Sequence, residues 1–202
     1  HYRMRRSVRL NNGGTSLQPV TVRSAQPGMA VIESTASEGF IVQAPYWVFE
    51  NLVIRGVCPV HSNCEHAFHV VGSAKGTVIR NNRIEDFNAH IKVNGLKGEW
   101  PDHGLLSHNT LTNTAPRSVH APVVAFDLVG ANHWRVQDNL VKDIVHTSAR
   151  WTTYGIYMKG ASEGGRIERN LVVCSSKNIS APGVRVGISF GGGATGAAFC
   201  RD

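Results

Sequence analysis

The sequence has no apolar run that approaches the ~18 residues of a membrane span. Its opening, HYRMRRSVRL, lacks the apolar core of a signal peptide, so we expect any export signal to have been removed or to lie outside this sequence. Charged residues make up only 17% of the 202 positions, whereas apolar residues reach 42%. This composition predicts one globular domain with a sizeable core and no membrane partner.

The signatures of several large protein classes are also missing. No Rossmann, P-loop, GxSxG or HExxH motif occurs, and the glycine-rich GISFGGGATG has no strand–turn–helix context around it. No helix-turn-helix, zinc-finger or RNA-recognition signature supports a nucleic-acid partner. The net charge of +7 suits an anionic partner such as an acidic polysaccharide, although a basic surface can also serve solubility alone.

Cysteine is scarce, with four residues. Cys58 and Cys64 close the short segment CPVHSNC, which predicts a disulfide, and Cys174 and Cys200 could form a second one. The alternative is four buried free thiols. An even count in a soluble chain favours an oxidising compartment, so we expect a secreted or periplasmic protein.

What the sequence does contain is a hidden repeat. Phrases such as AFHVVGS, HIKVNGL and GIYMKGA end at glycines separated by 23, 35, 30 and 32 residues, namely Gly72, Gly95, Gly130, Gly160 and Gly192. A second phrase, as in VIRNNRI, places asparagines at intervals of 31, 27, 30 and 31 residues, namely Asn51, Asn82, Asn109, Asn139 and Asn170. Each unit reads as short strands without helical periodicity, which excludes leucine-rich, ankyrin and tetratricopeptide repeats. A period near thirty therefore predicts the stacked coils of a parallel β-helix, with the asparagines stacked as a ladder.

Alignment on the glycines gives columns of large apolar residues that we expect to face the core. The first column is Phe40, Phe68, Ile91, Phe126, Ile156 and Ile188, and the second is Val42, Val70, Val93, Leu128, Met158 and Phe190. The other phrase gives Val48, Ile79, Leu106, Val136 and Ile167. We predict an all-β solenoid of about six coils in a single domain, residues 1–202. The coils span about 18–192, after a lead-in at 1–17 and before a truncated end at 193–202. We expect this to be a fragment of a longer helix, or one completed by a further chain or segment.

These columns resemble the right-handed parallel β-helix superfamily typified by pectate lyases, over about residues 18–192. The opening PVTVRSAQPGMAVIES…GFIVQAPYWVFENLVIRGV is similar to the first coils of alginate and chondroitin lyases. WPDHGLLSHNTLTNTAPR and GVRVGISFGGGATG resemble bacterial β-helix proteins of unassigned function. The resemblance implies cleavage of an acidic, uronate-containing polysaccharide by β-elimination, with a lysine or arginine base and often a calcium ion.

Between the inward positions lies a polar stripe on the outer face of the same strands. Its members are Ile41, Gln43, His69, Val71, Lys92, Asn94, Asp127, Val129, Tyr157, Lys159, Ser189 and Gly191. From each asparagine to the next inward residue the chain advances 17, 9, 17, 17 and 18 residues, and the short connection precedes Lys92. Long loops on both sides predict a walled cleft for an extended polymer. The bland alternative is a solvated strand face.

We assign roles on this stripe as hypotheses. Lys92 is the first candidate for the base, Lys159 or Arg150 would bind a carboxylate, and His69 and Tyr157 are acid or base options. The other expected substrate contacts are Asn94, Asp127, His66, Arg117, His120 and Trp151. Asp127 is the one carboxylate on the stripe, so calcium is an option with few ligands, and His66, His69 and His90 are an alternative metal set. The competing function is a non-catalytic carbohydrate-binding or cell-surface β-helix.

Overall fold

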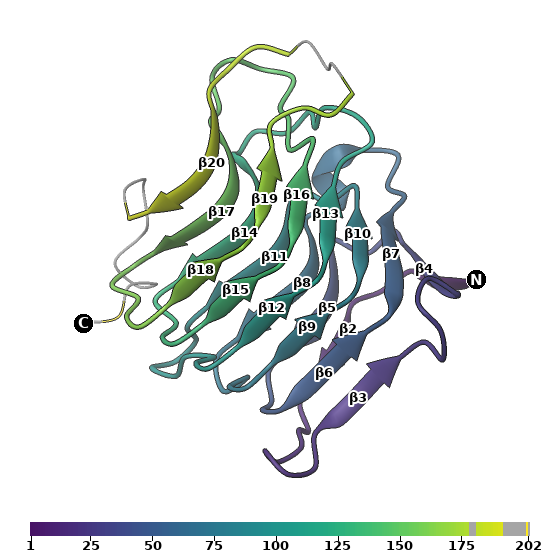
Figure 1. The fold of residues 1–202 in the computed structure, drawn as a ribbon. Helices are drawn as coiled ribbons and strands as arrows, with labels where there is room; N and C mark the ends of the chain where they lie inside the picture. Colours follow the sequence, from purple (N-terminus) through teal and green to yellow (C-terminus); the bar gives the residue numbers. More distant parts are fainter. Residues whose placement is uncertain (178–180, 192–200, 202) are drawn as a thin grey trace.

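The computed structural model describes residues 1–177, 181–191 and 201, and these form three parallel sheets that the chain visits in turn (Figure 1). Sheet A contains β1 (Tyr2–Met4), β4 (Ala30–Ser34), β7 (Leu52–Gly56), β10 (Arg83–Glu85), β13 (Thr110–Thr112), β16 (Leu140–Lys142) and β19 (Leu171–Val173). Sheet B contains β2 (Val8–Leu10), β5 (Glu38–Val42), β8 (His66–Val71), β11 (Ala89–Asn94), β14 (Val123–Val129), β17 (Thr153–Lys159) and β20 (Arg185–Phe190). Sheet C contains β3 (Val20–Arg23), β6 (Trp47–Glu50), β9 (Val78–Arg80), β12 (Leu105–Ser107), β15 (Arg135–Gln137) and β18 (Arg166–Glu168). A single short 3₁₀ turn, His61–Asn63, accompanies them in the described part of the chain.

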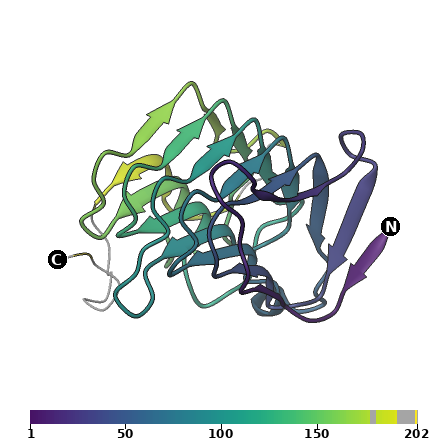
Figure 2. The ribbon, with the colours of Figure 1, turned by 90° about the horizontal axis from the view of Figure 1, so that it is seen from below.

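The predicted all-β solenoid of about six coils is confirmed. Each coil places one strand in sheet A, one in sheet B and one in sheet C, and every strand pairs in parallel with the same strand of the next coil. Seen from below, the chain winds around a common interior, with the colours advancing along the stack (Figure 2). The sheets begin earlier than the expected coil start near residue 18, because β1 and β2 already pair with β4 and β5.

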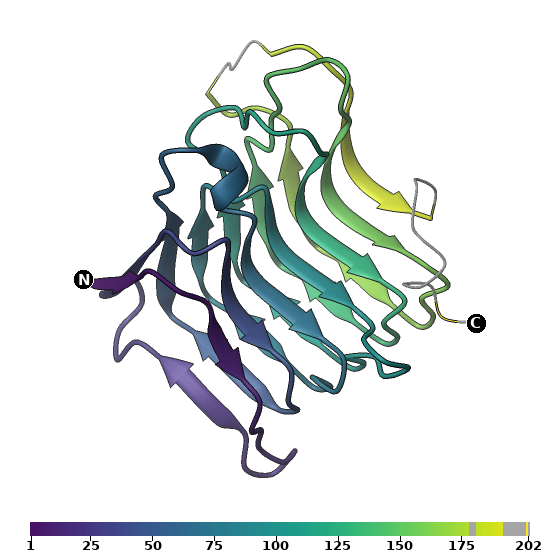
Figure 3. The same ribbon diagram turned by 180° about the vertical axis from the view of Figure 1, so that it is seen from behind.

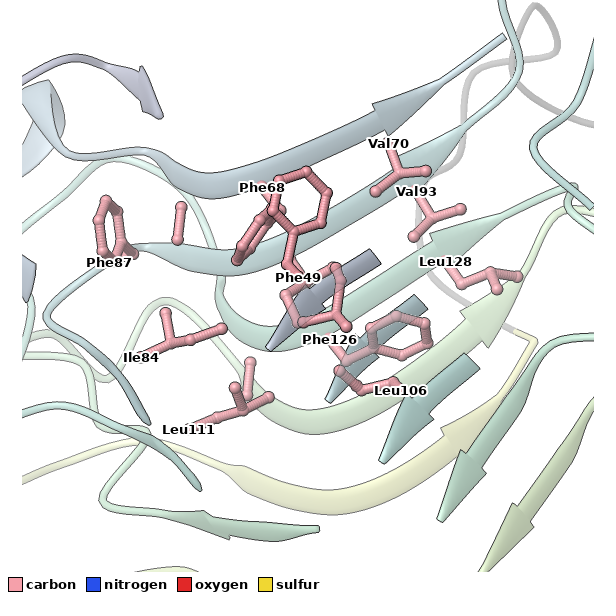
Figure 4. Packing of buried hydrophobic residues seen from close by; sticks show 14 of the residues in the cluster. Phe49, Phe68, Val70, Ile84, Phe87, Val93, Leu106, Leu111, Phe126 and Leu128 are labelled. Carbon is pink, nitrogen blue, oxygen red and sulfur yellow. The ribbon is translucent and has the colours of Figure 1, made fainter. Parts of the chain in front are cut away.

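The two inward columns of sheet B are confirmed from Phe40 to Ile156 and from Val42 to Met158. Their last members, Ile188 and Phe190, keep the register but are 44% and 68% exposed, because no further coil covers them in the described part of the chain. Phe68 pairs with Ile91, Ile91 with Phe126, and the next member is Ile156. Phe68, Ile91 and Phe126 are fully buried, and the aromatic rings of the early coils stack on one another, with 5.3 Å between the ring centroids of Phe40 and Phe68. Figure 4 shows labelled members of these columns beside residues from the other two sheets. Alternation of side chains along a strand therefore builds the core directly.

The sheet C column needs a correction of one residue in its first member. Phe49, not Val48, pairs with Ile79, and Phe49 is fully buried. The asparagine ladder shifts in the same way, since Leu52 rather than Asn51 stands one coil below Asn82. Asn51 instead pairs with Asn81, whose side chain donates to Asn51 Oδ1 at 2.6 Å. The sequence pattern placed Asn51 in the column of Asn82, whereas Asn51 belongs to the column of the preceding residue, Asn81.

From Asn82 onward the ladder is confirmed, through Asn109, Asn139 and Asn170. Asn82 donates a backbone and a side-chain N–H to Asn109 Oδ1, at 2.9 and 3.1 Å. The same pair of bonds joins Asn109 to Asn139, and Asn139 to Asn170. This column sits at the turn from sheet C to sheet A, where it satisfies backbone groups that leave the strand ladder.

The glycines that close the sheet B strands have two different reasons to be glycine. Gly72, Gly130 and Gly160 have φ between 62° and 74°, in the left-handed region that glycine adopts without strain. Gly95 instead lies against Trp100, since a Cβ there would come within 2.7 Å of the indole Nε1. Gly192 lies outside the described residues.

Candidate functional site on the outer face of sheet B

The polar stripe lies on one face of sheet B, as the sequence predicts. Lys92 pairs with His69 on one side and with Asp127 on the other, and Asp127 pairs in turn with Tyr157. Figure 3 shows the strands of sheet B side by side from behind. The register therefore brings His69, Lys92, Asp127 and Tyr157 into one column that crosses four coils.

A second outer column lies beside the stripe, and sequence reasoning missed it. It contains Glu38, His66, Ala89, Val124 and Tyr154. In a straight strand, residues three apart lie about 10 Å from each other and point to opposite faces. Here the ring centroids of Tyr154 and Tyr157 are 4.3 Å apart, and those of His66 and His69 are 5.4 Å apart. The strands of sheet B thus bend toward their outer side and bring the two columns together.

Small residues make the bend possible. On most strands of sheet B the residue directly after the second outer column is small. These residues are Gly39, Ala67, Ala125, Gly155 and Gly187, whereas β11 has His90 at this position. A Cβ on Gly155 would lie 2.5 Å from the carbonyl oxygen of Gly187, so the coils approach too closely there for a side chain. This column of small residues is the sequence signal that would have predicted the bend.

The centre of the stripe is an ion-paired cluster. Lys92 Nζ lies 2.5 Å from Asp127 Oδ2, and Lys159 Nζ lies 3.4 Å from Asp127 Oδ1. The side chain of Asp127 is only 11% exposed, and its Oδ1 accepts no hydrogen bond, so Lys159 supplies its electrostatic partner. The ion pair with Asp127 needs Lys92 in its ammonium form. To act as a base, Lys92 must first lose a proton.

One coil earlier, His69 joins two acceptors. Its Nδ1 lies 2.6 Å from Glu38 Oε1, and its Nε2 lies 2.8 Å from Asn94 Oδ1. Asn94 uses its own Nδ2 to donate to the carbonyl oxygen of Gly95, which orients its Oδ1 toward the histidine. Both contacts are hydrogen bonds only when both ring nitrogens carry protons, so this arrangement makes His69 a proton donor and not a free base. Glu38 is a site residue that the sequence did not reveal.

His66 has the opposite character. Its Nδ1 donates to the carbonyl oxygen of Ala89 at 3.0 Å, which leaves Nε2 as the unprotonated nitrogen. Burial, together with the neighbouring His69, lowers the pKa of His66 to about 4. His66 is therefore neutral at neutral pH. Its Nε2 atom lies 3.8 Å from Glu65 Oε1.

Tyr157 is a buried phenol at the far side of the cluster. Burial, then the adjacent Tyr154 and the Asp127 carboxylate, raise the pKa of Tyr157. The phenol consequently stays protonated at neutral pH and suits a donor role. Lys159 Nζ lies 4.2 Å from the centre of the Tyr157 ring, in cation–π contact.

The remaining predicted residues lie on the loops before sheet B, where Arg117 is buried and the others are more exposed. Arg117 is 4% exposed, and its guanidinium donates to Asn88 Oδ1 at 3.0 Å and to the carbonyl oxygen of His61 at 3.2 Å. It ties two loops together, and its burial in this structure does not favour the predicted substrate contact. Burial lowers the pKa of Arg117. His120 and Arg150 are exposed on the loops before β14 and β17, and the Arg150 guanidinium lies 5.5 Å from the Trp151 ring.

The spacing of coils limits which side chains can act together. Neighbouring strands lie about 4.8 Å apart, so His69 and Tyr157, three strands apart, are separated by about 14 Å along the stack. They cannot serve one reacting bond. The same spacing separates the carboxylates of Glu38 and Asp127, which is too far for the paired carboxylates of glycoside hydrolysis. Lys92 with His69 and Asp127 is the group that can.

Possible metal ligands do not gather in the described residues. No three side chains of His, Cys, Asp or Glu among them form a metal-binding group. Both oxygens of Asp127 face lysines, which disfavours a calcium ion there. His90 is fully buried and its Nε2 donates to the carbonyl oxygen of Thr112 at 2.9 Å, so it does not join His66 and His69.

The cysteine predictions divide. Cys58 and Cys64 form the predicted disulfide, with their Cα atoms 5.7 Å apart, in the loop that leads to His66. Cys174 is an exposed free thiol, and its suggested partner Cys200 lies outside the described residues. The disulfide indicates an oxidising environment. No helix in the described part of the chain has the length and apolar character to cross a membrane.

Comparisons with protein-family models, with curated proteins and with solved structures found no match for this chain. The parallel β-helix fold is shown by the three stacked parallel sheets themselves.

Proposed function

We propose that the outer face of sheet B binds an acidic, uronate-containing polysaccharide and cleaves it by β-elimination. The observation that carries this proposal is the cluster of Lys92, Asp127 and His69, in which a base, a proton acceptor and a proton donor lie on adjacent coils. The chain's net charge of +7 supports an anionic polymer as the partner. This partner and this reaction are those of the lyases that the sequence resembles.

In this proposal Lys92 passes its proton to Asp127 Oδ2 and becomes a neutral amine. The amine removes the C5 proton of a uronate residue, the electron pair forms the C4–C5 double bond, and the C4–O glycosidic bond breaks. His69 gives the departing oxygen its Nε2 proton, which Asn94 Oδ1 accepts at rest, while Glu38 holds Nδ1. Lys159 neutralises the uronate carboxylate, which makes the C5 proton more acidic. Calcium as an additional neutralising ion is a variant that the assay below includes.

A second candidate is binding without cleavage at the same face. The observation that favours it is that Lys92 and Lys159 both contact Asp127, so that their charges are already balanced in part. A binding protein needs only the charged face and the aromatic pair of Tyr154 and Tyr157. For either candidate, the disulfide supports a secreted or periplasmic location.

The experiment incubates the protein with alginate, pectate and glycosaminoglycans, with and without calcium, and follows the ultraviolet absorbance of the new double bond. Elimination predicts a rise that Lys92→Ala abolishes and that Lys142→Ala, on β16 of sheet A, leaves intact. Binding in calorimetry with no rise favours the second candidate. The absence of both a rise and binding with every polymer contradicts both.

A further inference from the structure

A hollow lies beyond the carboxyl-terminal ends of β8 and β11. It has a volume of about 420 Å³ and is lined by residues that include Ser73, Lys75, Glu99, Trp100, Asp102 and Arg201. A neighbouring hollow of about 210 Å³ shares Ser73 and Glu99 with it and extends along the same edge. The two together follow the turns that leave β8 and β11.

The wall of this hollow is an insertion in one coil. Ten residues, 95–104, connect β11 to β12, whereas the equivalent connections at 72–77, 130–134 and 160–165 have six, five and six residues. Leu96 and Glu99 bond to each other as a two-residue hairpin, with Lys97 and Gly98 at positive φ in its turn. A rigid insertion on a regular scaffold is where binding residues are commonly found.

The Trp100 indole is held between Gly95 and Arg201. Its indole packs on Gly95, where a Cβ would come within 2.7 Å of Nε1, and the guanidinium of Arg201 lies 4.7 Å from the ring centre. Arg201 in turn binds both carboxylate oxygens of Asp102, at 2.7 and 2.9 Å. The indole is thereby fixed in one position beside a polar wall.

The remaining polar groups are of mixed sign. Glu99 accepts a hydrogen bond from the hydroxyl of Ser73. Lys75 is exposed and forms no ion pair within the described residues, and its Nζ lies 5.9 Å from the Tyr46 ring. A fixed aromatic ring with a carboxylate, a hydroxyl and an unpaired ammonium matches a sugar that bears hydroxyls and one carboxylate.

We propose that this hollow is a second binding site, which holds one uronate residue of the polymer through side chains other than those of the cluster around Lys92. In it the sugar ring lies against Trp100, Lys75 meets the carboxylate, and Glu99 and Ser73 bond to hydroxyls. The ligand class rests on the proposed function of sheet B, whereas the existence of the site rests on the hollow and its lining residues.

The test measures binding of galacturonate and guluronate tetramers by calorimetry, with a neutral galactose tetramer for comparison. Lys75→Met should weaken binding of at least one uronate tetramer about tenfold, because a charge-assisted hydrogen bond is lost, and should not affect the neutral one. Trp100→Phe should weaken binding through the smaller ring. Lys142→Met, which removes the same charge from sheet A, should leave binding unchanged.

The outcomes separate this proposal from the previous one. Binding of both uronate tetramers that falls with Lys92→Ala and is unchanged in Lys75→Met and Trp100→Phe overturns the second site and leaves the sheet B function standing. Weaker binding in Lys75→Met, together with unchanged binding in Lys92→Ala and no elimination, supports the hollow and overturns the function proposed for sheet B. An equal loss in Lys142→Met, or no binding of either uronate tetramer, overturns the second site.

Discussion

Replacing Asn109 with alanine should remove a central rung of the asparagine ladder. The Asn109 side chain accepts two hydrogen bonds from Asn82, at 2.9 and 3.1 Å. Its Nδ2 donates to the carbonyl oxygens of Ile79 and Ser107 and to Asn139 Oδ1, at 2.9 to 3.0 Å. Asn109 is 1% exposed, so water cannot replace these partners without rearrangement of the coils.

The expected cost follows from these contacts. The two N–H groups of Nδ2 are shared among three acceptors, so the side chain contributes about four full hydrogen bonds. At about 1 kcal/mol each, their loss should lower the free energy of unfolding by about 4 kcal/mol. That is a large fraction of the roughly 5–15 kcal/mol that stabilises an average domain.

Urea denaturation followed by circular dichroism measures this change, and Asn51→Gly is the matched control. Asn51 has a φ of 65°, which glycine tolerates, and it lies one position outside the ladder, where it accepts a bond from Asn81. The control should lose less than about 1 kcal/mol. A loss below about 1 kcal/mol for Asn109→Ala, or equal losses for the two variants, would refute the ladder as a source of stability.

Three further outcomes follow from the coil geometry. Gly155→Ala should cost about 1–3 kcal/mol, because its Cβ would meet the next coil's backbone at 2.5 Å, whereas Gly187→Ala, whose nearest neighbour is at 3.7 Å, should be close to neutral in the same denaturation assay. Burial lowers the pKa of His90 from 6.5 to about 4, so the stability that the neutral, buried imidazole contributes is present above pH 6.5 and is lost as the pH falls toward 4. Between pH 7 and pH 4 the free energy of unfolding of the wild type should therefore fall by about 3 kcal/mol more than that of His90→Gln in the same assay. Replacing both Cys58 and Cys64 with serine should lower the unfolding free energy by about 2 kcal/mol, since the disulfide closes a short loop, and an unchanged melting temperature would contradict this.

The fold was predictable from the sequence because equivalent positions of successive coils carry similar side chains, which stack on one another. Columns such as Phe68, Ile91 and Phe126 appear as soon as the glycines are aligned, and the register confirms them. The error in the coil of Phe49 arose where two asparagines, Asn81 and Asn82, stand side by side. Alignment by residue type alone cannot choose between them, whereas the burial of Phe49 decides the frame.

The sequence predicted which face of sheet B carries the candidate site, but it did not predict the contacts between the side chains there. Alternation places Lys92 and Asp127 outward, but which lysine reaches which carboxylate depends on side-chain geometry across coils. Glu38 escaped notice because the bend at Gly39 breaks the alternation that identifies outward residues. Arg117 reads as a surface cation in the sequence, and only its loop contacts show that it is buried.

The spacing of the coils limits how the proposed elimination on sheet B could work. Each coil advances about 4.8 Å, so side chains that act together on one residue of a substrate must lie within about two coils of each other. Lys92, with His69 before it and Asp127 after it, meets that requirement, and Tyr154 and Tyr157 lie one coil beyond Asp127. Under the proposed elimination, Tyr157 would not transfer the proton at the cleaved bond, because it is almost covered and lies on the coil beyond Asp127. A polymer that runs along the stack would meet the charged cluster and the aromatic pair in succession, so the order of side chains along the column sets the order of subsites.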